Sequence, residues 1–190
     1  MIKGTEGISV KDITFLFTDL KGSTALYDRI GDLKAYSLVR QHFDSLGKVI
    51  VGNSGAIVKT IGDAVMASFL TPKDAVQAAL GMIREIDKFN QTLPARDIIL
   101  KVGLHKGPSI AVTLNERLDY FGQTVNIAAR VQGLAEAEEI FVTDDVYRST
   151  GVKDLLSGRD VTPSKATLKG VRDEMQVYKI RETHGGAGAT

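Results

Sequence analysis

The sequence predicts one α+β domain in which helices cover one face of an antiparallel-rich sheet. Short apolar runs, which are typical of buried strands, alternate along the chain with longer stretches of helical periodicity. Two of these runs, 56–61 and 64–69, are separated only by Gly62 and Asp63, which is the pattern of a β-hairpin and not of a parallel βαβ series. A chain of 190 residues, 43% of them hydrophobic, is long enough to bury one core.

The first half of the chain is expected to hold a central strand, two helices and this hairpin. The apolar run 13–17 predicts the central strand, and the turn at Gly22 leads into the first helix. From Ala35 to Ile50 apolar side chains recur at helical spacing, which predicts a long helix with one buried face. The segment 53–55 ends that helix.

The second half is expected to begin with another long helix. Pro72 suits its first position, and the apolar residues from Val76 to Ile86 mark its buried face. The remaining elements are expected in this order: a strand at 98–104, a helix at 121–134, a short buried strand at 140–142 and an edge strand at 171–180.

Composition excludes several classes of protein. The chain has no cysteine, so it forms neither a disulfide framework nor a thiolate zinc site, and its three histidines lack metal-ligand spacing. His105 is expected to pack within a strand. A net charge of +1 gives no footprint for nucleic acid. No apolar run reaches the ~18 residues of a membrane span.

These features favour a cytoplasmic location, although the chain can be a domain of a longer parent protein that carries a regulatory domain or a membrane attachment. We expect one domain over residues 1–183, followed by a flexible tail at 184–190 that is rich in small residues.

Two carboxylates stand where a charge is locally unusual. Asp19 follows an apolar strand, and Asp63 lies at the tip of the hairpin. If the two strands are neighbours, both carboxylates project from one end of the sheet and repel each other unless a cation lies between them. Mg²⁺ prefers oxygen ligands, and two such ions about 4 Å apart can hold the attacking and leaving oxygens of a phosphoryl transfer.

Purely structural interpretations of these residues remain open. Asp19 can form an Asx turn that leads into the helix, and Asp63 can be an ordinary hairpin residue. The glycine-led turn at Gly22 offers N–H groups to a phosphate, but Ser23 or Thr24 can also act as a helix N-cap.

Five segments resemble, in this order, the class III adenylyl and guanylyl cyclases. They are residues 17–24 (FTDLKGST), 59–63 (KTIGD), 102–108 (VGLHKGP), 119–130 (DYFGQTVNIAAR) and 168–170 (LKG). The fourth segment is similar to the family's signature helix and is highly specific. The resemblance covers about residues 13 to 180, and it implies a ferredoxin-like class III cyclase fold with residues 1–183 as the catalytic domain.

The resemblance also implies a cofactor and a binding site for a triphosphate. Asp19 and Asp63, with the Leu20 carbonyl, would hold two divalent cations, Mg²⁺ or Mn²⁺. The groups that would face the phosphates are the N–H groups of Gly22, Ser23 and Thr24 and the side chain of Lys169. Lys165 and Arg172 lie close to Lys169 in sequence and can substitute for it.

Base, ribose and transition state are assigned in the same way. Lys59 and Asp119 match the pair that reads the adenine edge, because an ammonium can donate to N1 while a carboxylate accepts from N6. Asn126 would orient the ribose. Arg130 would stabilise the charge of the transition state, and it shares a helix face with Asn126 because the two are four residues apart.

The implied activity is an adenylate cyclase that converts ATP to cyclic AMP and pyrophosphate. In the family the metal aspartates come from one chain and the other side chains from its partner, so a homodimer is expected. A guanylate cyclase, a diguanylate cyclase and a catalytically silent regulatory module are the alternatives. The stretch 108–119 is shorter than the family's dimer-contacting arm, which puts the contacts of that arm in doubt.

Overall fold

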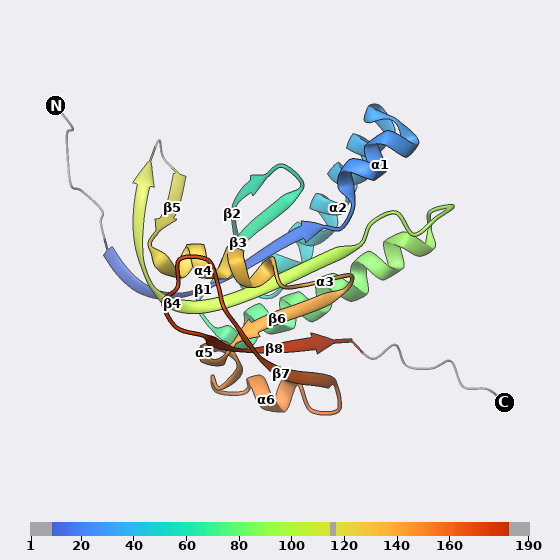
Figure 1. The fold of residues 1–190 in the computed structure, drawn as a ribbon. Coiled ribbons are helices and arrows are strands. Elements are labelled where there is room, and N and C mark those ends of the chain that lie inside the picture. The colour runs from blue at the N-terminus through green and yellow to red at the C-terminus, as the bar shows by residue number, and fades with distance from the viewer. Residues whose placement is uncertain (1–8, 115–116, 183–190) are drawn as a thin grey trace.

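The computed structural model describes residues 9–114 and 117–182. Within these residues eight strands form one sheet in the order β2-β3-β1-β4-β6-β8-β7, with β5 paired to the outer part of β4. All the pairings are antiparallel except β4 with β6. The predicted α+β class with an antiparallel-rich sheet is confirmed (Figure 1). The tail predicted at 184–190 lies outside the described residues.

The strands are β1 (Ser9–Leu20), β2 (Ala56–Ile61), β3 (Ala64–Phe69), β4 (Leu100–Leu114), β5 (Arg117–Phe121), β6 (Glu139–Thr143), β7 (Asp160–Ala166) and β8 (Met175–Arg181). The helices are α1 (Ser23–Ile30), α2 (Asp32–Gly52), α3 (Pro72–Gln91), α4 (Gln123–Gln132), α5 (Asp144–Tyr147) and α6 (Val152–Leu155).

The two long helices cover one face of the sheet. Residues of α2 and α3 share a hydrophobic cluster with Leu16 and Leu20 of β1. The side chain of Thr71 caps α3 by accepting a hydrogen bond from the Asp74 N–H, and Pro72 occupies the first turn as predicted. Because side chains alternate along a strand, Leu16 and Leu20 face these helices while Phe15 and Phe17 face the other way.

The opposite face carries the short helix α4. Phe15 and Phe17 pack there with Ala128 of α4. A Cβ at Gly103 of β4 would lie 2.1 Å from the backbone nitrogen of Gln132, so only glycine lets α4 cross the sheet this closely. Helix α4 is therefore an exception to the one-face arrangement of the long helices.

The centre of the sheet extends further than the sequence indicated. The strand predicted at 98–104 continues to Leu114, because β1 pairs with it over its whole length, from Leu20↔Leu100 to Ser9↔Ala111. The chain then turns back as β5, so the helix predicted at 121–134 begins only at Gln123. The β4–β5 hairpin projects from the end of the sheet remote from α1 (Figure 1).

The C-terminal strands also differ from the prediction. The strand predicted as an edge at 171–180 is β8, which lies inside the sheet between β6 and β7. The edge is β7, which the sequence did not predict because most of its side chains are exposed and it contains Pro163. The four-residue helices α5 and α6 were also not predicted.

Candidate active site

Asp19 and Asp63 lie at the same end of adjacent strands. Strands β1 and β3 pair with Phe17 opposite Met66, and one step further the Thr18 hydroxyl accepts a hydrogen bond of 3.0 Å from the Val65 N–H. This bond fixes the start of β3 beside the end of β1. The predicted juxtaposition of the two carboxylates therefore follows from the sheet.

The β2–β3 turn buries one carboxylate oxygen of Asp63. Gly62 has φ +62°, a left-handed conformation that suits glycine in this two-residue hairpin. Oδ2 of Asp63 is buried and has no hydrogen-bond partner among the described residues. A buried acceptor without a donor lowers the stability of the folded state, and a cation would be a suitable partner for this oxygen.

A buried histidine lies within electrostatic reach of Asp63. His42 of α2 is fully buried, its Nδ1 lies against the Val39 carbonyl, and its Nε2 has no partner among the described residues. Burial lowers the pKa of His42, while the hydrogen bond to Val39 and the charge of Asp63 oppose that shift. His42 was not predicted as a site residue, although it stands on the buried face of the helical repeat.

Asp19 has a direct cationic partner. The Nζ atom of Lys101 lies 2.8 Å from Oδ2 of Asp19, and the two residues are opposite each other in the β1–β4 ladder. Lys101 was not predicted as a site residue either, because only the strand register brings it to the carboxylate.

The turn after β1 leaves the first turn of α1 free of side-chain caps. Gly22 is the N-cap residue, with φ 72°, and within the described part of the chain the helix has no side-chain cap hydrogen bond. The N-cap role considered for Ser23 or Thr24 is therefore not observed. The Lys21 N–H is held by the Ile99 carbonyl at 2.8 Å, which anchors the turn to the chain entering β4.

Lys59 and Asp119 meet in an ion pair. Nζ of Lys59 donates hydrogen bonds to both carboxylate oxygens of Asp119, at 2.8 and 2.9 Å. Desolvation alone would raise the pKa of Asp119, but the hydrogen bonds from Lys59 and the Tyr120 N–H and the charge of Lys59 outweigh it and lower that pKa. The carboxylate is therefore held in its charged form as an acceptor.

Asn126 and Arg130 occupy the outer side of α4. Asn126 is exposed and Arg130 is half-buried, while Ile127 and Val131 between and beyond them are buried. The guanidinium lies beside the turn after β7, because a Cβ at Gly170 would be 3.4 Å from its Nη1 atom. That contact brings the exposed Lys169 backbone next to Arg130.

The alternatives to Lys169 differ in their surroundings. Lys165 approaches Glu174 at 4.0 Å, whereas Lys169 directly precedes the glycine that packs on Arg130. Of these two lysines, Lys169 is therefore the one whose neighbour in sequence contacts Arg130.

The donor set fits hard divalent cations. In residues 9–114 and 117–182 no three His, Asp or Glu side chains gather to form a cage made of protein alone. The pair Asp19 and Asp63 offers carboxylate oxygens, one of them buried and unpartnered. Mg²⁺ is usually bound by one or two carboxylates, with waters and substrate phosphates completing its octahedron, so the residues present fit that ion.

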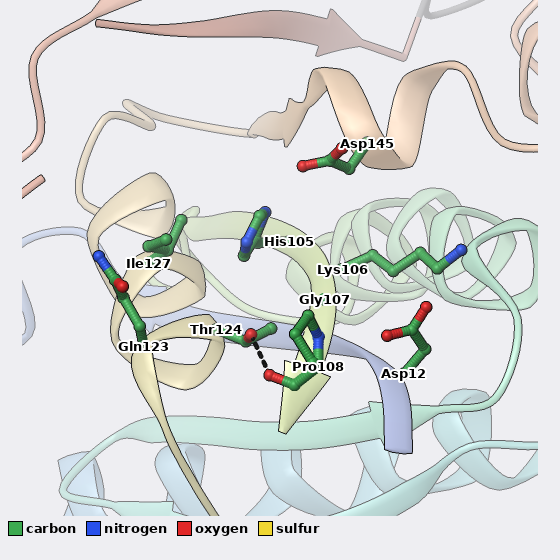
Figure 2. A pocket seen from close by; sticks show the side chains of 9 residues that line it. All are labelled: Asp12, His105, Lys106, Gly107, Pro108, Gln123, Thr124, Ile127 and Asp145. Atoms are coloured by element: carbon green, nitrogen blue, oxygen red, sulfur yellow. Dashed lines mark hydrogen bonds between the residues drawn. The ribbon is translucent and has the colours of Figure 1, made fainter. Parts of the chain in front are cut away.

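A separate hollow of about 470 Å³ lies beside the middle of β4, against residues 105–108 (Figure 2). Figure 2 shows Asp12, Lys106 and Asp145 around it, with the Thr124 hydroxyl donating to the Pro108 carbonyl. None of the assigned site residues lines it. His105 beside it is a packed strand histidine, as expected: it is buried, and its Nδ1 lies 2.8 Å from the Thr143 hydroxyl.

Fold and site together define a class of protein. Two carboxylates at the end of neighbouring strands, a glycine-led turn beside them and an arginine-bearing helix across the sheet are the features expected of a nucleotidyl cyclase catalytic domain. The chain belongs to the family of adenylate and guanylate cyclase catalytic domains, whose model matches residues 7–182.

Sequence relatives agree with this family. The chain is 28% identical over 188 residues to an adenylate cyclase of Anabaena cylindrica, covering 91% of this chain and 37% of that protein. It is 31% identical over 176 residues to an adenylate cyclase of Glutamicibacter nicotianae, covering 89% of this chain and 39% of that protein. The chain thus spans less than half the length of either relative.

Solved structures show the same fold. The adenylyl cyclase CyaB from P. aeruginosa matches with a TM-score of 0.76 and 23% identity, covering 95% of this chain and 99% of that one. The guanylyl cyclase Cya2 matches with a TM-score of 0.78 and 20% identity, covering 90% and 92%. In the described residues no helix is long and apolar enough to cross a bilayer.

Proposed function

We propose that this chain is an adenylate cyclase domain that converts ATP to 3′,5′-cyclic AMP and pyrophosphate as a homodimer with two shared sites. The ribose 3′-oxygen forms a bond to the α-phosphorus, and the bond from that phosphorus to the bridging oxygen of the β-phosphate breaks. The 3′-hydroxyl proton passes to solvent or to the substrate phosphates, and pyrophosphate leaves.

The ion pair of Lys59 with Asp119 carries the choice of ATP. Adenine presents an N6 donor beside an N1 acceptor, which matches a carboxylate beside an ammonium. Guanine presents an O6 acceptor beside an N1–H donor, so it would leave both side chains with the wrong partner. Unpaired polar groups in a binding site discriminate strongly between such substrates.

Asp19 and Asp63 would hold the two divalent cations together with the Leu20 carbonyl. When bound, Mg²⁺ or Mn²⁺ supplies Lewis acidity that activates the 3′-hydroxyl and neutralises the leaving phosphates. The protein contributes position, since the β1–β3 pairing and the two-residue turn fix both carboxylates at one sheet end.

The phosphates and the ribose would be held by three further elements. The uncapped first turn of α1 presents the N–H groups of residues 22–24 to the triphosphate. Asn126 orients the ribose, and Arg130 stabilises the charge that develops on the α-phosphate oxygens, a role that suits its permanent charge. Lys169 contacts the terminal phosphates from the turn beside Arg130.

The homodimer is supported by the directions of two side chains on one hairpin. Lys59 reaches Asp119 of β5, whereas the carboxylate of Asp63 acts on His42 of α2. One nucleotide is not easily contacted by both groups of the same chain, so each chain gives its Asp63 to one site and its Lys59 to the other. Large apolar side chains exposed on β2, β4 and β5 are suited to burial in that dimer: Ile57, Ile61, Ile110, Leu118 and Phe121.

The test is direct product identification. The purified chain is incubated separately with ATP and with GTP, each with Mg²⁺ or Mn²⁺, and the products are identified by mass. The proposal predicts cyclic AMP and pyrophosphate from ATP as the main products. Cyclic GMP as the main product would assign a guanylate cyclase, and the absence of any cyclic nucleotide under all four conditions would assign a silent module.

A further inference from the structure

The carboxylate of Asp19 is already neutralised by a cation of the same chain. Asp19 and Lys101 are direct partners in the β1–β4 ladder, and opposite residues on one face of antiparallel strands lie close enough to interact. The ammonium is 2.8 Å from Oδ2. Only 19% of the Lys101 side chain and 32% of the Asp19 side chain are exposed, so the pair is partly shielded from water.

The surroundings offer the ammonium a second anion. Glu136, in the turn between α4 and β6, accepts a hydrogen bond of 2.8 Å from Lys21. The hydrogen bond and charge of Lys21 lower the pKa of Glu136, and the charge of Lys101 acts in the same direction. The charge of Lys101 therefore acts on two carboxylates: Asp19, which it contacts at 2.8 Å, and Glu136, which is hydrogen-bonded to Lys21.

Resting on the proposed metal role of Asp19, we propose that Lys101 is an internal competitor of the divalent cation. In the metal-free chain its ammonium occupies the carboxylate that the metal needs. A dication held by Asp19 would repel the ammonium of Lys101 towards Glu136, the other carboxylate on which its charge acts. Lys101 thus sets the affinity for metal, and it prevents the bare site from binding metal tightly before the nucleotide arrives with its own negative charge.

Removing the charge of Lys101 should raise the affinity of the site for a divalent cation. Lys101→Met keeps an unbranched side chain that is one atom shorter and removes the charge, so a dication at Asp19 gains a free carboxylate and loses a repulsive neighbour. At the separations and dielectric of a partly exposed site, one such charge changes the affinity for a dication by about tenfold. Lys101→Arg keeps the charge and is the matched control.

The experiment is a titration of the nucleotide-free full chain with Mn²⁺, followed by the electron paramagnetic resonance signal of free Mn²⁺. The Kd for Mn²⁺ of Lys101→Met should fall about tenfold, and that of Lys101→Arg should stay within about twofold of the original. Lys21→Met removes a neighbouring charge that is held by Glu136, and it should change the Kd by less than about threefold. Circular dichroism and thermal unfolding confirm that each variant is folded.

Asp19→Asn, combined with Lys101→Met, identifies the site that is measured, and it should abolish the gain in Mn²⁺ affinity that Lys101→Met alone produces. An unchanged or weaker Mn²⁺ affinity in folded Lys101→Met overturns the inference, as does an equal gain in Lys21→Met or a double variant that keeps the gain. Cyclic nucleotide formation is assayed separately. A chain that makes cyclic AMP but shows no gain in Lys101→Met refutes the competitor role alone, whereas a chain without cyclase activity refutes the proposed function and leaves the metal titration interpretable.

Discussion

Lys59 and Asp119 are sixty residues apart in sequence, yet the lysine donates hydrogen bonds to both carboxylate oxygens of the aspartate. Lys59 lies on β2 at one edge of the sheet, and Asp119 lies on β5, the strand that folds back from the outer part of β4. The pair presents a donor and an acceptor side by side on a rigid frame. Such an arrangement matches one purine edge and mismatches the other.

Exchanging this pair should change the preferred base. Lys59→Glu with Asp119→Cys places an acceptor where the ammonium was and removes the carboxylate that accepts from adenine N6. Each polar match typically contributes ~1–3 kcal/mol, so the ratio of GTP to ATP turnover should rise by tenfold or more. The control is Lys165→Glu with Glu174→Cys, the same exchange in an exposed pair of β7 and the segment before β8. A folded Lys59/Asp119 variant with unchanged base selectivity contradicts the base-reading role.

Removing Asp63 should separate activity from stability. Its Oδ2 atom is buried and has no hydrogen-bond partner in the part of the chain that the structure describes, so Asp63→Ala removes an unfavourable burial as well as the proposed metal ligand. Cyclic AMP formation should fall by at least ~10²-fold, while the midpoint of thermal unfolding stays the same or rises. Asp44→Ala, at an exposed position of α2, should leave both measurements unchanged. Near-normal activity in Asp63→Ala would exclude the two-metal site.

Gly103 should tolerate no side chain. A Cβ there would lie 2.1 Å from the nitrogen and 2.2 Å from the Cα of Gln132, and this backbone cannot yield without moving α4. Gly103→Ala should therefore lower the free energy of unfolding by about 2 kcal/mol or more. Gly52→Ala, in the last turn of α2 with no atom within 4 Å of its added Cβ, should instead stabilise by about 0.5 kcal/mol. Urea denaturation measures both changes, and a neutral Gly103→Ala would refute the close packing of α4.

Acid should destabilise the fold through His105. Burial lowers the pKa of this histidine, and the charge of Asp145 only partly offsets that effect. In the unfolded chain His105 has its ordinary pKa of about 6.5, so below that pH it binds a proton that the folded chain excludes. The contribution of neutral His105 to stability is therefore fully present above about pH 6.5. It is lost progressively as the pH falls towards the lower pKa of the folded state. His105→Asn should lose less stability than the original chain between about pH 7.5 and 5.5 in urea titrations. Buried His42 keeps part of the effect in both chains, so equal slopes would contradict the argument.

Sequence patterns predicted the elements whose signal is local. The hairpin at Gly62 and Asp63 was identified because a two-residue turn between apolar runs permits few other structures. Strand β7 was not identified, because an exposed edge strand has no hydrophobic period and Pro163 interrupts it. The extension of β4 beyond Leu104 was also not predicted. Pairing with β1 holds that extension in place, and such pairing leaves no trace in local periodicity.

The site residues likewise divide into those with a local sequence signal and those that only the folded structure brings to the site. Asp19, Asp63 and the polar face of α4 could be named because they stand in ordered segments that resemble one family. Lys101 and His42 could not be named in this way. Lys101 reaches Asp19 only through the register of two strands distant in sequence, and the charge of Asp63 acts on the pKa of His42 although the two residues are far apart in sequence.

A complementation assay tests the shared site most directly. Asp63→Ala and Asn126→Ala should each be inactive alone, since each lesion removes a group that every site needs. In a mixed dimer one site receives both lesions and the other receives neither. Random mixing in equal amounts makes about half of the dimers mixed, each with one intact site, so about a quarter of the original activity should return. A mixture that stays inactive after subunit exchange has been demonstrated with two affinity tags would contradict the shared site, because each nucleotide would then be held by one chain alone.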